Sequence, residues 1–135
     1  MFAAGFPIHQ PNGLEQTLAA YDRIIGSERL RLMHLNDSKA AFDSRVDRHW
    51  HIGEGQIGLA GMRGIVTHPK LQAVPMILET PKKLPTDDPR NLACVRRFRS
   101  DGAGTATAPS LVALDARTST PIARARRARK KPSHG

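Results

Sequence analysis

The sequence is poor in several residue types, and each shortage excludes a class of protein. A single cysteine, Cys94, stands among 135 residues, so an intrachain disulfide and a cysteine-based zinc site are both excluded. Aromatic residues make up 4% and hydrophobic residues 39% of the chain, which predicts one small domain with a thin aliphatic core. No apolar run approaches the roughly 20 residues of a membrane-spanning helix, and the N-terminus lacks signal-peptide features. We therefore expect no membrane association and a reducing, cytoplasmic location.

Positive charge is concentrated near the C-terminus. The formal net charge is +9, and residues 101–135 hold seven Lys and Arg against two Asp. Residues 100–135 are also rich in Gly, Ala, Thr and Ser and offer too little apolar surface to offset the entropy of ordering. We predict a disordered basic tail there. A basic arm on nucleic acid and an altered reading frame are the alternatives.

Residues 1–99 alternate helical and extended patterns. Apolar residues at the 3.6 period predict helices at 14–25, 59–67 and 91–98, and short apolar runs predict strands at 30–35 and 74–79. Residues 36–57 are expected to form a long functional loop.

Each predicted helix has a stripe of residues expected to face inward. The stripes are Leu14, Leu18, Tyr21 and Ile25; Leu59, Met62 and Val66; and Leu92, Val95 and Phe98. Asn12 is the expected N-cap of the first helix and Asp87 or Asp88 that of the last. Alternating helices and strands predict an α/β fold with parallel strands.

Metal-ligand side chains are placed where such folds collect ligands, at the carboxyl ends of strands. His34 lies near the end of the first strand, and Glu79 ends the second. Asp47 and His49 lie between them in an Asp-x-His pattern, whose side chains point the same way in extended chain and suit zinc or manganese. The alternatives are a charged surface loop, a hydrogen-bonded interior histidine at His34 and a paired carboxylate at Glu79.

The remaining unusual residues receive weaker predictions. Arg45 and Arg48 flank the Asp-x-His pattern with charge suited to phosphate. His51 is expected to support the ligands or lie at the surface, and His9 and His68 receive no role. Cys94 is expected to be a small core residue. Trp50 is compatible with stacking on a base or with covering the loop.

Four segments, with the spacing between them, resemble the endonuclease IV family of zinc-dependent apurinic/apyrimidinic (AP) endonucleases. They are Met33-His34-Leu35-Asn36-Asp37-Ser38-Lys39, Ser44-Arg45-Val46-Asp47-Arg48-His49, Ile52-Gly53-Glu54-Gly55-Gln56-Ile57-Gly58 and Pro75-Met76-Ile77-Leu78-Glu79-Thr80-Pro81. The likeness runs from residue 2 to residue 99. It identifies residues 1–99 as the C-terminal portion of a TIM-type (β/α)8 barrel, with its last two strands and their flanking helices.

The resemblance also implies an activity and a set of roles. The family hydrolyses the phosphodiester 5′ to abasic sites in DNA, during base excision repair, with three zinc ions. His34 and Glu79 would bind one zinc, and Asp47 and His49 another, with Glu79 also catalytic. The residues implied for DNA phosphates are Lys39, Arg45 and Arg48.

The resemblance covers only part of the family's site. The ligands on the first six strands have no counterpart, and two strands cannot close a barrel. We therefore expect a partial zinc site, DNA with abasic sites as partner and the remaining N-terminal barrel portion as a second partner. The alternative functions are a metal-dependent sugar isomerase or epimerase, and a non-catalytic zinc- or DNA-binding remnant.

Overall fold

The computed structural model describes residues 1–102 and contains three α-helices and four short strands in that range. The helices are α1 (Pro11–Ile24), α2 (Gly58–Thr67) and α3 (Asp87–Gly102); the strands are β1 (Met33–Leu35), β2 (Asp37–Ser38), β3 (His49–Trp50) and β4 (Met76–Leu78). Two 3-10 turns, η1 (Phe2–Ala4) and η2 (Ser27–Arg29), complete the order. The predicted tail lies outside the described residues, except for 100–102, which end α3.

The two predicted strands pair in parallel, which confirms the expected α/β arrangement. In the β1–β4 sheet Met33 is opposite Met76, His34 opposite Ile77 and Leu35 opposite Leu78. Both strands are shorter than predicted. The pairing continues one step beyond β4, where the Glu79 N–H donates to the Leu35 carbonyl oxygen at 3.1 Å.

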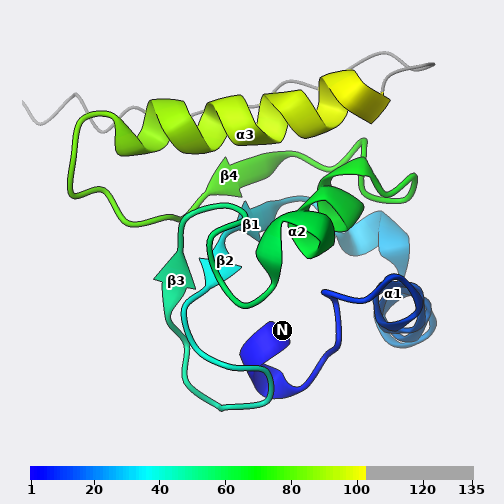
Figure 1. Cartoon of the computed structure of the whole chain (residues 1–135). Coiled ribbons are helices and arrows are strands. Elements are labelled where there is room, and N and C mark those ends of the chain that lie inside the picture. Colours follow the sequence, from blue (N-terminus) through cyan, green and yellow to red (C-terminus); the bar gives the residue numbers. More distant parts are fainter. Residues whose placement is uncertain (103–135) are drawn as a thin grey trace, which may run out of the picture.

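The three helices follow one another around this sheet, with α2 between α3 and α1 (Figure 1). α3 runs along β4 and also contacts α2, whereas α1 lies away from α3 and contacts α2 and η2. One continuous apolar cluster joins these elements. Its buried members are Phe2, Leu14, Leu35, Ile52, Ile57, Met62, Ile65, Val66, Leu71, Met76, Val95 and Phe98.

The start and the end of the first helix differ from prediction. α1 begins at Pro11 with Gln10 as the N-cap, so the predicted N-cap Asn12 is wrong. Proline is favoured at the first helical position because its missing N–H would have no partner there. Ile25 is predicted on the inward stripe, but it follows the end of the helix and is 46% exposed.

The second helix buries two of the three residues predicted to face inward. Met62 and Val66 are fully buried as expected, but Leu59 is 59% exposed, so its inward placement is wrong. Leu59 instead packs over the turn at Gly53, where a Cβ would lie 2.6 Å from Leu59 Cδ1. Gly61 faces inward, and a Cβ there would lie 2.9 Å from His9 Cα. The glycine therefore allows α2 to approach the N-terminal segment closely.

The third helix begins earlier than predicted. Val95 and Phe98 are buried and Leu92 is half-buried, but α3 starts at Asp87. The Asp87 carboxylate accepts hydrogen bonds from the N–H groups of Lys83 and Leu84, both at 2.9 Å. It therefore stabilises the turn that leads into the helix.

One buried carboxylate organises the segment that the sequence predicts as a loop. Asp37 is fully buried, and its Oδ1 accepts from the N–H groups of Ser38 at 2.7 Å and Ile57 at 2.9 Å. Its Oδ2 accepts from Gly55 at 3.0 Å and Gly58 at 3.2 Å. A Cβ at Gly55 would collide with this carboxylate, so glycine permits the approach. The loop is therefore closed at its base.

The same segment contains a small antiparallel ladder that the sequence did not predict. Asp37 of β2 pairs with Trp50 of β3, and Ser38 pairs with His49. The expectation of a continuous loop over 36–57 is therefore wrong at residues 37–38 and 49–50, which form these strands.

We expect Asp37→Ala to lower the free energy of unfolding by about 3 kcal/mol or more, because it leaves four backbone N–H groups without their acceptor and each costs ~1–3 kcal/mol. Asp37→Asn keeps one carbonyl oxygen and should lose less. Urea unfolding followed by circular dichroism measures both losses. Asp22→Ala is the control, since the Asp22 carboxylate is exposed and, within residues 1–102, accepts hydrogen bonds from Ser27 alone. A loss for Asp37→Ala as small as that of Asp22→Ala would contradict this role.

Candidate metal and phosphate site

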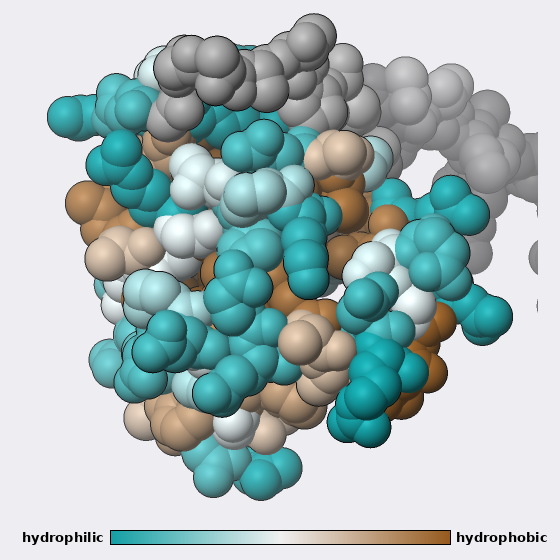
Figure 2. Space-filling view, turned by 90° about the vertical axis from the view of Figure 1, so that its right-hand side faces the viewer, coloured by the Kyte–Doolittle hydropathy of each residue, from teal (hydrophilic) through white to brown (hydrophobic). Residues whose placement is uncertain are grey.

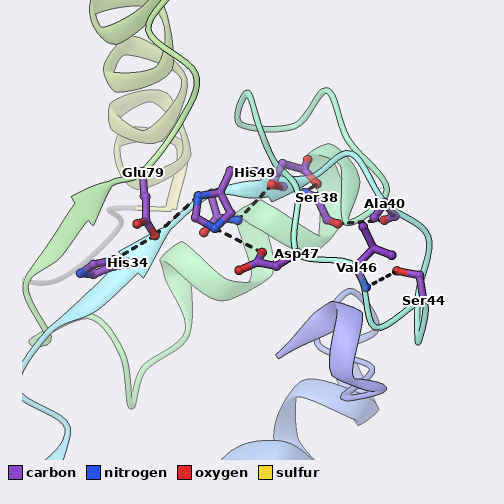
Figure 3. Close-up of polar contacts among 10 residues, drawn as sticks. His34, Ser38, Ala40, Ser44, Val46, Asp47, His49 and Glu79 are labelled. Carbon is purple, nitrogen blue, oxygen red and sulfur yellow. Dashed lines mark hydrogen bonds and ion pairs between the residues drawn. The ribbon is translucent and has the colours of Figure 1, made fainter.

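The four predicted metal ligands lie in a row of direct contacts (Figure 3). His34 Nδ1 is 2.9 Å from Glu79 Oε2, and His49 Nδ1 is 3.7 Å from the same oxygen. On its other side, His49 Nε2 is 3.3 Å from Asp47 Oδ1. The Glu79 carboxylate thus lies between two imidazoles from separate strands.

The backbone explains why these side chains meet. His34 lies in the middle of β1 and Glu79 directly follows β4, so the parallel pairing brings both to one edge of the sheet. β2 follows β1 after a single residue, Asn36, and its pairing with β3 brings His49 to the same edge. Asp47 lies at the same edge because it precedes His49 by two residues, and side chains two residues apart in an extended chain point the same way.

The row of contacts is open to solvent. The exposed fractions of the side chains are 56% for His34, 44% for Glu79, 31% for His49 and 86% for Asp47. Ion pairs at such exposure contribute little to stability. The contacts of the row therefore contribute little to the stability of the fold.

The row borders a cavity of about 490 Å³. His34 and Asp47 belong to its polar end, and most of its lining is apolar and comes from η1, α1, β1 and α2. On the side of the molecule that carries α1, hydrophobic surface is visible between hydrophilic residues (Figure 2). Two residues of the row, His34 and Asp47, thus line a mostly apolar cavity.

The donor set suits zinc, but it is grouped in pairs. Imidazole nitrogens and carboxylate oxygens are ordinary zinc ligands, and a structural zinc takes four. Within residues 1–102, no three His, Cys, Asp or Glu side chains are arranged to hold one ion. The pairs in contact, His34 with Glu79 and Asp47 with His49, are those that the resemblance assigns to separate zinc ions. Zinc binding by these pairs stays a prediction.

The three basic residues predicted for DNA phosphates occupy different environments. Lys39 Nζ lies 4.4 Å from the centre of the Trp50 ring, which is a cation–π contact. Arg45 has a positive φ of 59° and pairs with Asp43 at 2.9 Å. Arg48 is exposed, and its carbonyl accepts from the Lys39 N–H. Lys39 and Arg48 thus lie together, whereas the Arg45 side chain is already engaged.

The other histidines and the cysteine have structural surroundings. His68, which received no role, is buried, and its Nε2 lies 2.8 Å from Glu15 Oε1, joining the end of α2 to α1. His9 packs edge-on against Phe2. Cys94 is half-buried, and burial raises the pKa of its thiol, which is typical of a structural cysteine.

Sequence reasoning missed a buried residue beside the site. Asn91 is 2% exposed, and its Oδ1 accepts from the Ile52 N–H at 2.9 Å. Its Nδ2 lies 3.1 Å from both His51 Nδ1 and Thr80 Oγ1. His51 is consequently buried rather than at the surface. A signal existed: Asn91, Val95 and Phe98 follow the i, i+4, i+7 pattern of one inward helix face.

The structure therefore defines a parallel α/β protein with histidines and carboxylates at the carboxyl edge of its strands. The profile of the family described as xylose isomerase-like TIM barrel matches residues 1–98. The chain belongs to this family.

The comparisons with individual proteins confirm the resemblance to endonuclease IV. The chain is 48% identical over 97 residues to a probable endonuclease 4 of Methanosphaerula palustris, covering 72% of this chain and 34% of the relative. A probable endonuclease 4 of Chloroflexus aurantiacus is 46% identical over 97 residues, covering 71% and 34%. The crystal structure of endonuclease IV from Thermus thermophilus superimposes with a TM-score of 0.66 at 37% identity, covering 74% of this chain and 36% of that one. The chain thus spans about a third of the length of these proteins. No helix among residues 1–102 is long and apolar enough to cross a membrane.

The surroundings of Asp87 predict a pH dependence of stability. Hydrogen bonds from the backbone N–H groups, that of Leu84 first, lower the pKa of Asp87. A carboxyl group with a lowered pKa in the folded state stabilises the fold above its unfolded pKa, and this contribution is lost as the pH falls through the folded value. Asp87→Asn should therefore lose less stability than the parent between pH 5 and 3. Urea midpoints across that range test this, and parallel curves for the two proteins would contradict it.

Proposed function

We propose that residues 1–99 form the C-terminal portion of an endonuclease IV-type barrel and carry part of a zinc-dependent AP endonuclease site. The basic tail, predicted over residues 100–135, would begin after α3, which ends at Gly102. The observation that supports the proposal is the row His34, Glu79, His49 and Asp47 at the carboxyl edge of parallel strands. The similarity to proteins named endonuclease 4 supports the same activity, hydrolysis of the phosphodiester 5′ to an abasic site.

Each residue has a proposed role. His34 and Glu79 would hold one zinc ion, and Asp47 and His49 another. Bound zinc supplies Lewis acidity and lowers the pKa of water. Glu79 is the proposed catalytic residue because the resemblance implies this role, and its carboxylate contacts one histidine of each pair. Lys39 and Arg48 would attract DNA phosphates, and this binding would weaken as salt increases. Arg45 would join them once its side chain is released from Asp43.

We expect the 135-residue chain to bind fewer than three zinc ions, and weakly, because four ligands cannot complete three sites. Glu79→Gln should weaken zinc binding further, and it should abolish any EDTA-sensitive cleavage of a duplex that contains one abasic site. Elemental analysis after gel filtration and a gel assay of the 5′ cleavage product measure the two effects. Glu28→Gln is the control, since Glu28 is exposed and remote from the row. Three tightly bound zinc ions would contradict the partial site.

The same assay separates the alternative functions. A sugar isomerase or epimerase is compatible with the family description, but the basic residues beside Asp47 favour a phosphate-bearing substrate. A non-catalytic remnant would bind DNA in a salt-sensitive way after Asp47→Ala, and would lose this binding when residues 117–131 are deleted.

We also propose that a second polypeptide portion, equivalent to the part of the relatives that this chain does not match, covers the cavity. Two observations support this: the apolar lining of the 490 Å³ cavity and the two-stranded β1–β4 sheet, which is too small to be independently stable without further packing. DNA cleavage would then require both portions.

Mixing the chain with the unmatched part of the Methanosphaerula palustris protein should give a complex with more bound zinc and faster cleavage than either part alone. Leu30→Asp should weaken this complex because Leu30 lines the cavity. Leu92→Asp is the matched control, since Leu92 is half-buried like Leu30 and lies outside the cavity lining. Size-exclusion chromatography with zinc analysis measures assembly. Equal assembly of both variants would contradict docking in the cavity.

A further inference from the structure

Direct strand pairing does not connect the segment that carries His49 to the segment that carries Glu79. Among residues 1–102 the strands form two separate ladders, β1 with β4 and β2 with β3. The first ladder carries His34 and precedes Glu79, and the second carries His49. Asn36 joins the two ladders covalently between β1 and β2. No ladder joins β3 to β4 in this part of the chain, so strand pairing does not set the separation of His49 from Glu79.

The side chain of Asn91, in α3, connects the two segments. Asn91 Oδ1 accepts from the N–H of Ile52, three residues after His49, at 2.9 Å. Asn91 Nδ2 lies 3.1 Å from the hydroxyl oxygen of Thr80, the residue after Glu79. The same nitrogen lies 2.8 Å from the Asp87 carbonyl oxygen, which anchors the amide to its own helix.

We propose that Asn91 is a positioning residue that fixes His49 relative to Glu79. It acts through the backbone of Ile52 and the hydroxyl of Thr80 rather than through either ligand side chain. The assignment of a metal-binding purpose to this geometry rests on the proposed function, but the geometric role does not.

The amide is the side chain that this bridge requires. It combines an acceptor for the Ile52 N–H with donors for Thr80 and the Asp87 carbonyl. A carboxylate at this position keeps the acceptor and loses the donors. Alanine loses both and leaves buried polar groups without partners, which lowers stability as well. The test must therefore separate positioning from stability.

Val95 provides the matched control, because it lies one turn further on the same helix face and is fully buried, with no polar group to bridge the two segments. Asn91→Ala and Val95→Ala should both lower the urea midpoint. Two readouts are then compared in the full chain: the dissociation constant for Co²⁺ from its visible absorption, and the ring NMR signals of His34 and His49 without metal.

We expect Asn91→Ala to shift the His49 ring signals and to weaken Co²⁺ binding at least tenfold. Val95→Ala should leave the ring signals in place and Co²⁺ binding within twofold. Ring signals that are unchanged in Asn91→Ala, or that move equally in Val95→Ala, overturn the inference. If the parent binds no Co²⁺, the proposed metal function fails, and the ring signals still decide the role of Asn91. If Asn91→Ala does not fold, Asn91→Asp undergoes the same comparison.

Discussion

The buried carboxylate of Asp37 is the interaction on which the arrangement of the site depends. Its two oxygens accept hydrogen bonds from four backbone N–H groups, those of residues 38, 55, 57 and 58. The β2–β3 ladder has only two residues in each strand and would be marginal alone. The Asp37 carboxylate binds the chain again after β3. His49 is therefore held by the ladder with β2 and by the hydrogen bonds that fix the residues following β3. A flexible loop would not hold His49 beside Glu79.

Local pattern explains which parts of the fold the sequence predicts. Helices and parallel strands follow from apolar periodicity and alternation, which are properties of neighbouring residues. The Asn12 cap is wrong because a proline one position earlier starts the helix, and the inward Leu59 is wrong because a glycine turn gives it another surface to cover. β2 and β3 escape prediction because two residues are too few to show alternation.

In the site, too, features that depend on neighbouring residues can be predicted, whereas contacts between distant residues cannot. Strand ends and an i, i+2 spacing mark His34, Asp47, His49 and Glu79 as candidates, and the resemblance to endonuclease IV implies their roles. The structure brings the four into a row of contacts. Asp37 and Asn91 bind backbone groups as far as 21 and 39 positions away. Any residue other than proline offers a backbone N–H, so the partners of these two side chains leave no trace in the sequence. Only the three-dimensional structure reveals them.

Exposure connects the site to the surface beside it. The side chains of His34 and Asp47 are more than half exposed, so water screens the charges of the row. Electrostatic stabilisation of a developing charge is effective where water is excluded and the dipoles are fixed in advance. Within this chain, Asp37 and Asn91 fix the groups of the site in advance. Exclusion of water depends on what covers the apolar cavity that begins at His34 and Asp47. The ordering of the ligands and the exclusion of water are therefore separate requirements, and residues 1–102 satisfy the ordering while leaving the cavity to be covered.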